Sequence, residues 1–242
     1  MKKPTALASM LKKSALLLAL LAICAPVCPA QTPAQPAPGA AQAAAPKPDR
    51  WAKAMAVFAA QDRDKPPAPG GVLFLGSSSI RLWKTLAEDF PGVPLLNRGF
   101  GGSHIADSVR HFDTLVTPSK PRLIVFFAGT NDINSGKPPE EVAADFRALV
   151  GKIHAAQPET RVIFISLAIA PRRWEKRAAM ALANTYIAAF CASDARLRFV
   201  DTNAVMLAPD GTARPEYYVE DRLHMSPAGY AVWAELLRPL VK

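Results

Sequence analysis

The sequence predicts one α/β domain with a mostly parallel central sheet, and three observations lead to this prediction. Short apolar runs without alternation, bounded by glycine or polar residues, are typical of strands buried on both faces. These runs alternate with longer segments whose apolar residues recur at helical spacing. The alternation extends over about 190 residues, which is a suitable length for one large domain.

The first fifty residues are predicted to lie outside that domain. Residues 1–30 carry four lysines, an apolar run and small residues at the end, which is the pattern of a secretory signal peptide. The apolar run is too short for a comfortable transmembrane helix, so an uncleaved membrane anchor is the less favoured alternative. Residues 31–50 are rich in alanine, proline and glutamine and predict a flexible linker. The domain is expected to span residues 51–242, in a periplasmic or secreted protein.

Charge and cysteine content narrow the possible partners. Loss of the signal peptide lowers the net charge from +9 to +5, because residues 1–30 contain four lysines and no acidic residue. No basic stripe with interleaved aromatic residues is present, so nucleic acid is not a predicted partner. Cys191 is expected to be a buried thiol without a disulfide. Neither a metal nor a cofactor is predicted, and no stable membrane insertion is expected after cleavage. The oligomeric state is not predicted.

The first half of the domain begins with a short helical pattern at residues 51–60, which a cluster of prolines and glycines ends. Residues 71–76, GVLFLG, form an apolar run between glycines and predict a strand. A helix is predicted at residues 79–88 and a second strand at residues 93–97. The helix predicted at residues 104–116 places its apolar residues on one face.

The second half contains the clearest strand and helix patterns. Residues 122–129, RLIVFFAG, predict a strand, and residues 138–156 predict a helix with proline and acidic residues in its first turn. A strand, a helix and a last strand follow, at residues 161–169, 174–193 and 197–202. The final helix begins at Ser226, a suitable N-cap that is followed by proline.

Ligands of parallel α/β sheets bind beyond the carboxyl ends of the strands, so polar residues in those loops are the candidate site. Gly76 and the serines 77–79 follow the first strand, where a hydroxyl at a tight turn is exposed beside unpaired N–H groups. Three serines alone are more often a helix cap. The loop at residues 97–104 contains three glycines, which let the backbone approach a ligand, but it lacks the dinucleotide-binding pattern.

The remaining two loops contribute an amide and an acid–base pair. Asn131, in GTND, can donate to a ligand oxygen, although a single asparagine is more often a turn residue. In DRLH, the carboxylate of Asp221 can bond one imidazole nitrogen of His224 and leave the other as a directed base. The alternative is a solvated loop with an incidental histidine. His111 and His154 lie on predicted helices and are expected to be exposed.

The four blocks GSSS, GFGGS, GTND and DRLH resemble, in order and spacing, those of the SGNH (GDSL-type) hydrolases, and most of all their acetylhydrolase-like members. The resemblance covers residues 71–242 and implies a three-layer α/β/α, flavodoxin-like fold. It implies that Ser78 is the nucleophile, that Asp221 and His224 are its acid and base, and that Ser78, Gly102 and Asn131 donate to the oxyanion.

One position departs from the family pattern. Ser77 stands where the motif usually has aspartate, but that aspartate is not the acid of the triad. The match of Gly76 to the motif glycine favours Ser78 over its neighbours as the nucleophile.

The predicted function is a secreted serine esterase that hydrolyses short-acyl esters, above all acetyl esters, on small molecules or glycans. His104, Arg173 and Trp174 are candidate substrate-lining residues; the basic loop at residues 171–174 either offers cations to an acidic glycan or is a solvated turn. The alternatives are an acylhydrolase of the lysophospholipase or thioesterase type and a glycan-binding relative without activity. A binding module has no need of a directed base, which counts against the last of these.

Overall fold

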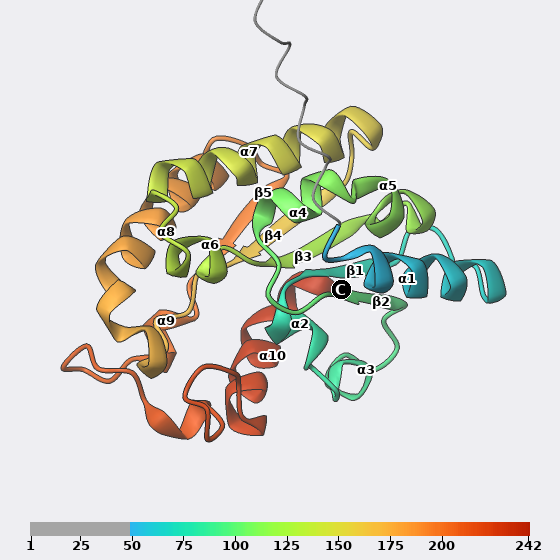
Figure 1. Ribbon diagram of the computed structural model, residues 1–242. Helices are drawn as coiled ribbons and strands as arrows, with labels where there is room; N and C mark the ends of the chain where they lie inside the picture. The colour runs from blue at the N-terminus through green and yellow to red at the C-terminus, as the bar shows by residue number, and fades with distance from the viewer. Residues whose placement is uncertain (1–48) are drawn as a thin grey trace, which may run out of the picture. The chain divides into compact units, whose positions relative to one another are not determined.

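The computed structural model describes residues 49–242, in which one parallel sheet lies between two layers of helices (Figure 1). The strands lie in the spatial order β2, β1, β3, β4, β5, and every neighbouring pair is parallel. Their bounds are Val72–Gly76 for β1, Leu95–Gly99 for β2, Leu123–Phe127 for β3, Arg161–Ile165 for β4 and Leu197–Val200 for β5. The three-layer α/β/α prediction is confirmed, and all the carboxyl ends of the strands meet at one edge.

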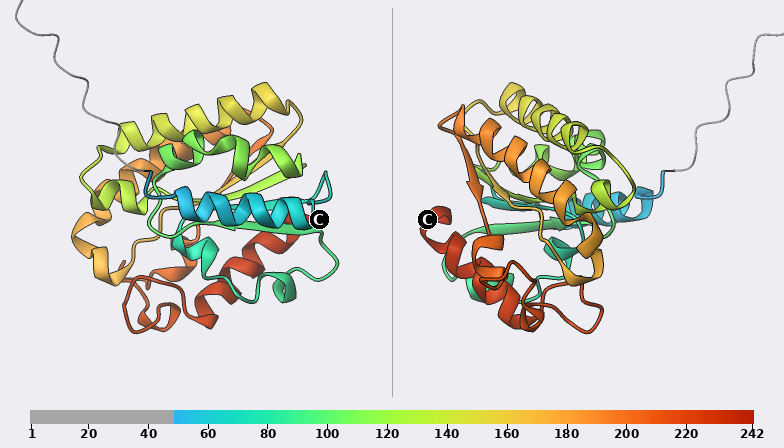
Figure 2. Two further views of the ribbon diagram at one scale, coloured as in Figure 1. Left: turned by 45° about the vertical axis from the view of Figure 1, so that its right-hand side comes forward. Right: turned by 90° about the vertical axis from the view of Figure 1, so that its left-hand side faces the viewer.

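Two apolar clusters, one on each face of the sheet, form the core. The helices that contribute to the first are α1 (Ala52–Asp64), α4 (Ile105–Arg110), α5 (Phe112–Leu115), α6 (Thr130–Asn134), α7 (Pro139–Ala156) and α8 (Arg177–Ala192). Those that contribute to the second are α2 (Ser78–Arg81), α3 (Leu86–Asp89), α9 (Asn203–Met206) and α10 (Pro227–Val241). Figure 2 shows α7 and α10 on opposite sides of the sheet.

The burial of the strands explains why their sequences do not alternate. In β1, Leu73 and Leu75 pack into the first cluster, whereas Val72 and Phe74 pack into the second. Successive side chains of a strand point to opposite faces, so a strand covered on both sides must be apolar throughout. One apolar face of α7 is buried against the sheet, as are Tyr230, Trp233 and Leu237 of α10.

Two of the predicted helices are each broken into two shorter ones. The segment predicted as a helix at residues 79–88 forms α2 and α3, separated by a turn that carries Trp83. The Trp83 indole is buried between the rings of Phe74, Phe90 and Tyr230, and its Nε1 donates to Asp89 at 2.7 Å. The segment at residues 104–116 similarly forms α4 and α5, with the break at residue 111. Helical spacing of apolar residues does not show such a break, because both short helices bury the same face.

The predicted strand at residues 161–169 is too long, because β4 ends at Ile165. Residues beyond it stay buried, but side-chain amides replace the strand ladder. Asn184 bonds both the N–H and the C=O of Leu167, and Asn203 accepts from the N–H of Ile169. The helix predicted from residue 174 also begins differently: a 3-10 segment, η2 (Pro171–Lys176), precedes α8. The η2 segment lies at the carboxyl edge of the sheet, where Arg173 donates to Asn131 in the helix that follows β3.

The expectation that His111 and His154 are exposed is wrong. Their side chains are only 11% and 12% exposed, and each lies beside a carboxylate, Asp49 for His111 and Asp194 for His154. Cys191 is buried as expected, and burial raises the pKa of its thiol to about 12. Within residues 49–242, no helix has the length and apolar character that crossing a membrane requires. The predicted signal peptide, residues 1–30, and all but the last two residues of the predicted linker at 31–50 lie outside the described residues and stay predictions.

Candidate active site

Ser78 is the first residue of α2, directly after the carboxyl end of β1. The turn is possible because Gly76 has φ +144°, and a Cβ there would lie 2.0 Å from the carbonyl oxygen of Phe127 on the neighbouring strand. The N–H of Ser77 donates to that same carbonyl at 2.9 Å, so the turn is anchored to β3. The neighbouring hydroxyl-bearing residues Ser77 and Ser79 are buried, whereas Ser78 is partly exposed at the edge of the sheet.

His224 and Asp221 reach Ser78 from the loop that precedes α10. The Nε2 atom of His224 lies 2.9 Å from the Oγ of Ser78, and its Nδ1 lies 2.5 Å from Oδ2 of Asp221. The three side chains therefore form one continuous line of hydrogen bonds. The arrangement leaves Nε2 of His224 directed at the hydroxyl, which is the position of a general base for a serine nucleophile.

The Asp221 carboxylate is fixed by its own loop. Its Oδ1 accepts the N–H groups of Leu223 and His224 at 2.8 and 2.9 Å. Partial desolvation raises the pKa of Asp221, but these N–H donors and the imidazole outweigh it and lower the pKa to about 2. The turn also requires Arg222 to adopt φ +58°, a conformation that side chains other than glycine rarely take. The sequence DRLH therefore holds an ionised carboxylate against the imidazole.

The loops after β2 and β3 bring Gly102 and Asn131 to the same edge. Gly102 has φ +77°, which glycine adopts without steric cost. Within residues 49–242, the backbone N–H groups of Ser78 and Gly102 have no protein acceptor. The Nδ2 of Asn131 donates to the carbonyl oxygen of Ser103 at 3.1 Å, and its Oδ1 accepts from Nη2 of Arg173 at 2.8 Å. Two backbone donors without a protein acceptor and one positioned amide thus belong to residues that line the same cleft.

A cleft of about 400 Å³ opens over these groups. The residues that line it are Ser78, Arg81, Gly101, Gly102, Asn131, Arg173, Leu223 and His224. The charged side chains of this lining are the two arginines, with no carboxylate among them. Cavities of about 410 and 570 Å³ lie elsewhere, and neither is lined by any of the residues that line the cleft. The chemistry, rather than the volume, therefore identifies the candidate site.

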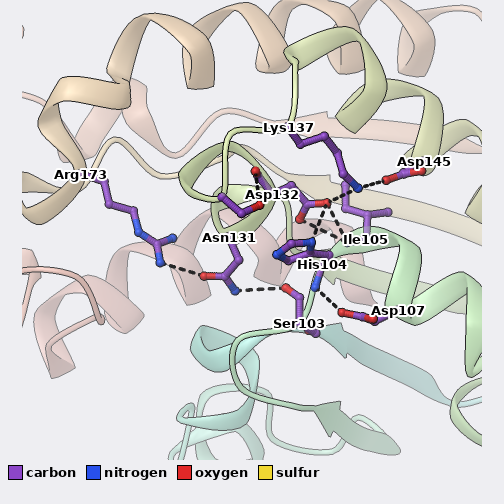
Figure 3. Close-up of polar contacts among 10 residues, drawn as sticks. Ser103, His104, Ile105, Asp107, Asn131, Asp132, Lys137, Asp145 and Arg173 are labelled. Atoms are coloured by element: carbon purple, nitrogen blue, oxygen red, sulfur yellow. Dashed lines mark hydrogen bonds and ion pairs between the residues drawn. The ribbon is translucent and has the colours of Figure 1, made fainter. Parts of the chain in front are cut away.

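A buried carboxylate joins the two loops that carry Gly102 and Asn131. Asp132 is fully buried, and its oxygens accept the N–H of Ile105 at 3.3 and 3.4 Å and the ammonium of Lys137 at 3.0 Å (Figure 3). Burial raises the pKa of Asp132, while the facing His104 and Lys137 act in the opposite direction. The contact ties the start of α4 to α6, so the loop before α4 and the loop before α6 keep their spacing.

The three predicted substrate-lining residues occupy different places. Arg173 lines the cleft and touches Asn131. His104 does not line the cleft; its Nδ1 lies 3.9 Å from the Asp132 carboxylate, and its ring points into the network of Figure 3. Trp174 also does not line it, because the indole packs against the first apolar cluster. The structure therefore brings together Ser78, His224, Asp221, Gly102, Asn131 and Arg173.

The sequence motifs assign no role to Asp132 and do not predict the contact between Arg173 and Asn131. For Asp132 a clue was present, because an acidic residue followed a fully apolar strand in GTND and a lysine came five residues later. A carboxylate that is buried in such a place needs a cation or N–H donors. For Arg173 the sequence held no clue to its partner, since the two residues are 42 positions apart.

Known proteins resemble this chain in sequence. The sequence matches the profile of the GDSL-like lipase/acylhydrolase family over residues 73–232. The human platelet-activating factor acetylhydrolase IB subunit alpha2 is 30% identical over 205 residues, which cover 80% of this chain and 84% of that protein. The alpha1 subunit from Bos taurus is 29% identical over 208 residues, covering 79% of this chain and 82% of that protein.

Solved structures share the fold. A GDSL-like lipase from Bacteroides thetaiotaomicron has a TM-score of 0.63 at 24% identity, covering 79% of this chain and 95% of that one. An acetylxylan esterase from Geobacillus stearothermophilus has a TM-score of 0.59 at 18% identity, covering 73% and 96%. At these identities the similarity concerns the arrangement of the sheet and helices.

Proposed function

The chain belongs to the GDSL-like lipase/acylhydrolase family, as the resemblance of its sequence blocks predicts, and we propose that it is a serine esterase. The observation that carries this proposal is the line of hydrogen bonds from Asp221 through His224 to Ser78. A carboxylate, an imidazole and a hydroxyl in this order activate a serine for attack on an acyl carbonyl. The proposed reaction is ester hydrolysis through an acyl-serine.

In the first step, Oγ of Ser78 attacks the carbonyl carbon of the ester while Nε2 of His224 takes the hydroxyl proton. Asp221 stabilises the imidazolium that forms. The negative charge of the tetrahedral intermediate falls on the former carbonyl oxygen, where the N–H groups of Ser78 and Gly102 and the amide of Asn131 receive it. His224 then gives its proton to the alcohol oxygen, the ester C–O bond breaks, and the acyl group remains on Ser78.

In the second step, water replaces the alcohol. His224 takes a proton from this water as its oxygen attacks the acyl carbon, and the same three donors receive the second oxyanion. The proton returns to Oγ of Ser78 as the acyl–serine bond breaks. The products are a carboxylic acid and the free enzyme, so no further reactant is needed.

We further propose a preference for short acyl groups, above all acetyl. A recess of only about 10 Å³ lies against Ser78, Asn131 and His224, with Phe127 and Met225 among its walls. This volume holds at most about one water-sized group, so the recess excludes a long acyl chain and favours a small acyl group. A relative at 30% identity is named an acetylhydrolase, which supports the same preference.

The natural substrate that we propose is an ester on a small molecule or glycan outside the cytoplasm. This part rests on the signal-like sequence of residues 1–30. Fractionation of cells that express the full chain, or a chain without residues 1–30, tests it. We expect only the full chain to reach the periplasm or medium; the same distribution for both would contradict export.

Two measurements test the esterase proposal. A fluorophosphonate probe should label the protein once, at Ser78, and aryl acetate should be hydrolysed faster than aryl butyrate or longer esters. Absence of labelling and of turnover would indicate a relative without activity. Labelling combined with a maximum at long chains would retain the serine mechanism and contradict the short-acyl preference.

A further inference from the structure

The side-chain amide of Asn131, which lines the cleft, is held at both ends. Its Oδ1 accepts from Nη2 of Arg173 at 2.8 Å, and its Nδ2 donates to the carbonyl oxygen of Ser103 at 3.1 Å (Figure 3). The two partners come from different elements, η2 after β4 and the loop after β2. The amide is therefore clamped between two loops.

The clamp selects one orientation of the amide. A guanidinium has only donors and a carbonyl has only acceptors. If the amide rotated by half a turn, its NH2 group would face the guanidinium of Arg173 and its oxygen would face the carbonyl of Ser103. Both contacts would then be repulsive. In the observed orientation only one of the two Nδ2 hydrogens is donated to Ser103. No other protein acceptor contacts Nδ2 within residues 49–242, so the second hydrogen has no protein partner there.

We infer that Arg173 is a positioning residue for the oxyanion site, which it serves by fixing the Asn131 amide with a free N–H on the cleft side. The inference rests on the proposed esterase function. Arg173 is suited to this role because no carboxylate pairs with it among the described residues, so its hydrogen bond to Asn131 has no competing ion pair. The side chain is half-buried, which limits its freedom to move away.

An alternative role for Arg173 is direct binding of an anionic substrate, since it lines the cleft together with Arg81. The two roles predict different kinetics. A positioning residue changes how well the transition state is stabilised, and therefore changes kcat on every ester. A group that binds substrate charge changes KM, and does so for anionic esters alone.

The experiment compares Arg173→Ala and Arg173→Lys with the wild type on a neutral aryl acetate. We expect Arg173→Ala to lower kcat by roughly 10- to 100-fold with KM within about twofold, because small misplacement of a catalytic group has effects of this size. Arg173→Lys should fall between the two, because an ammonium can still donate to Oδ1. Guanidinium ion at non-denaturing concentration should partly restore Arg173→Ala.

Arg172→Ala is the matched control. Arg172 is the neighbouring residue on the same turn, its side chain is exposed, and it bonds the protein through its backbone N–H to Arg222. Its replacement removes the same charge from the same loop without touching Asn131. We expect its kcat to equal that of the wild type.

A double variant decides whether Arg173 acts through Asn131. In an Asn131→Ala background, Arg173→Ala should cause no further loss of kcat, because residues that act as one unit are not additive. Independent, multiplicative losses would overturn the inference, as would wild-type kcat in Arg173→Ala or a KM effect confined to anionic esters. Thermal unfolding confirms that each variant is folded. An inactive wild type would instead contradict the proposed function itself.

Discussion

The Nε2 atom of His224 lies 2.9 Å from the Oγ of Ser78, although 146 residues separate them in the chain. A second long-range bond supports this contact. The hydroxyl of Tyr230, on α10, donates to the carbonyl oxygen of Ser79 at 2.8 Å, and both groups are buried. The helix that follows the base is thereby fixed to the helix that begins with the hydroxyl. The distance between them depends on packed elements rather than on a free loop.

The first prediction concerns the nucleophile. Ser78→Ala should abolish both ester hydrolysis and fluorophosphonate labelling, because no other hydroxyl contacts Nε2 of His224 within the described residues. Ser77→Ala and Ser79→Ala are the controls, since these side chains are buried, 1% and 5% exposed. They should keep the label, which peptide mapping would locate at Ser78. A label that survives Ser78→Ala would assign the reaction to another serine.

The second prediction concerns the carboxylate. Asp221→Asn preserves the shape of the side chain but removes its charge, so it no longer stabilises the imidazolium or fixes the tautomer of His224. We expect kcat to fall by about 10³- to 10⁴-fold, which is the scale for serine triads. The carboxylate has a pKa of about 2, so it stays ionised throughout the pH range of a kinetic assay. Activity near that of the wild type would show that His224 works without it.

The third prediction concerns the oxyanion. Asn131→Ala should lower kcat by about a hundredfold or more and change KM little, because the amide interacts with the charge that develops in the transition state. Steady-state kinetics on aryl acetate measure both parameters. A fully active Asn131→Ala variant would contradict the oxyanion assignment and, with it, the role given to Arg173.

The sequence was sufficient to predict the layers of the fold and the loops that form the candidate site. Strands such as residues 71–76 and 122–129 are apolar because helices cover both faces, so composition alone identifies them. The position of the polar loops then follows from the parallel sheet. The break between α2 and α3 is not visible in the local pattern, because Trp83 leaves the helix to join an aromatic cluster assembled from distant segments.

Contacts between distant loops also cannot be predicted from local sequence patterns, because the partners are far apart in the chain. Asn184 and Asn203 each bond the backbone after β4, and a strand pattern cannot distinguish these amide partners from a neighbouring strand. His154 looked exposed on its helix, but the carbonyl of Thr160 lies 3.1 Å from its Nε2. Such hydrogen bonds depend on the tertiary fold, which brings residues from different segments together.

The fourth prediction tests the turn that carries Ser78. Gly76→Ala should destabilise the fold by more than about 4 kcal/mol, because its Cβ would lie 2.0 Å from the backbone oxygen of Phe127 and φ is +144°. Gly151→Ala is the matched control. Gly151 lies within α7, and a Cβ there meets nothing within 4 Å. That variant should be more stable by about 0.5–1 kcal/mol in urea unfolding. Equal stability of the two variants would contradict the close approach of the strands.

The fifth prediction concerns alkaline pH. Burial raises the pKa of Cys191 from its ordinary 9.0 to about 12. Between these values the thiol ionises in the unfolded chain and stays protonated in the folded one, so unfolding releases a proton. The free energy of unfolding should therefore fall as pH rises above about 9, by as much as about 1.4 kcal/mol per pH unit. Urea titrations from about pH 8 to pH 9 measure the slope, because the buried Tyr218 and Tyr230, whose ordinary pKa is 10.0, add to it as pH approaches 10. Cys191→Ala should flatten it, and an unchanged slope would assign the effect to other groups.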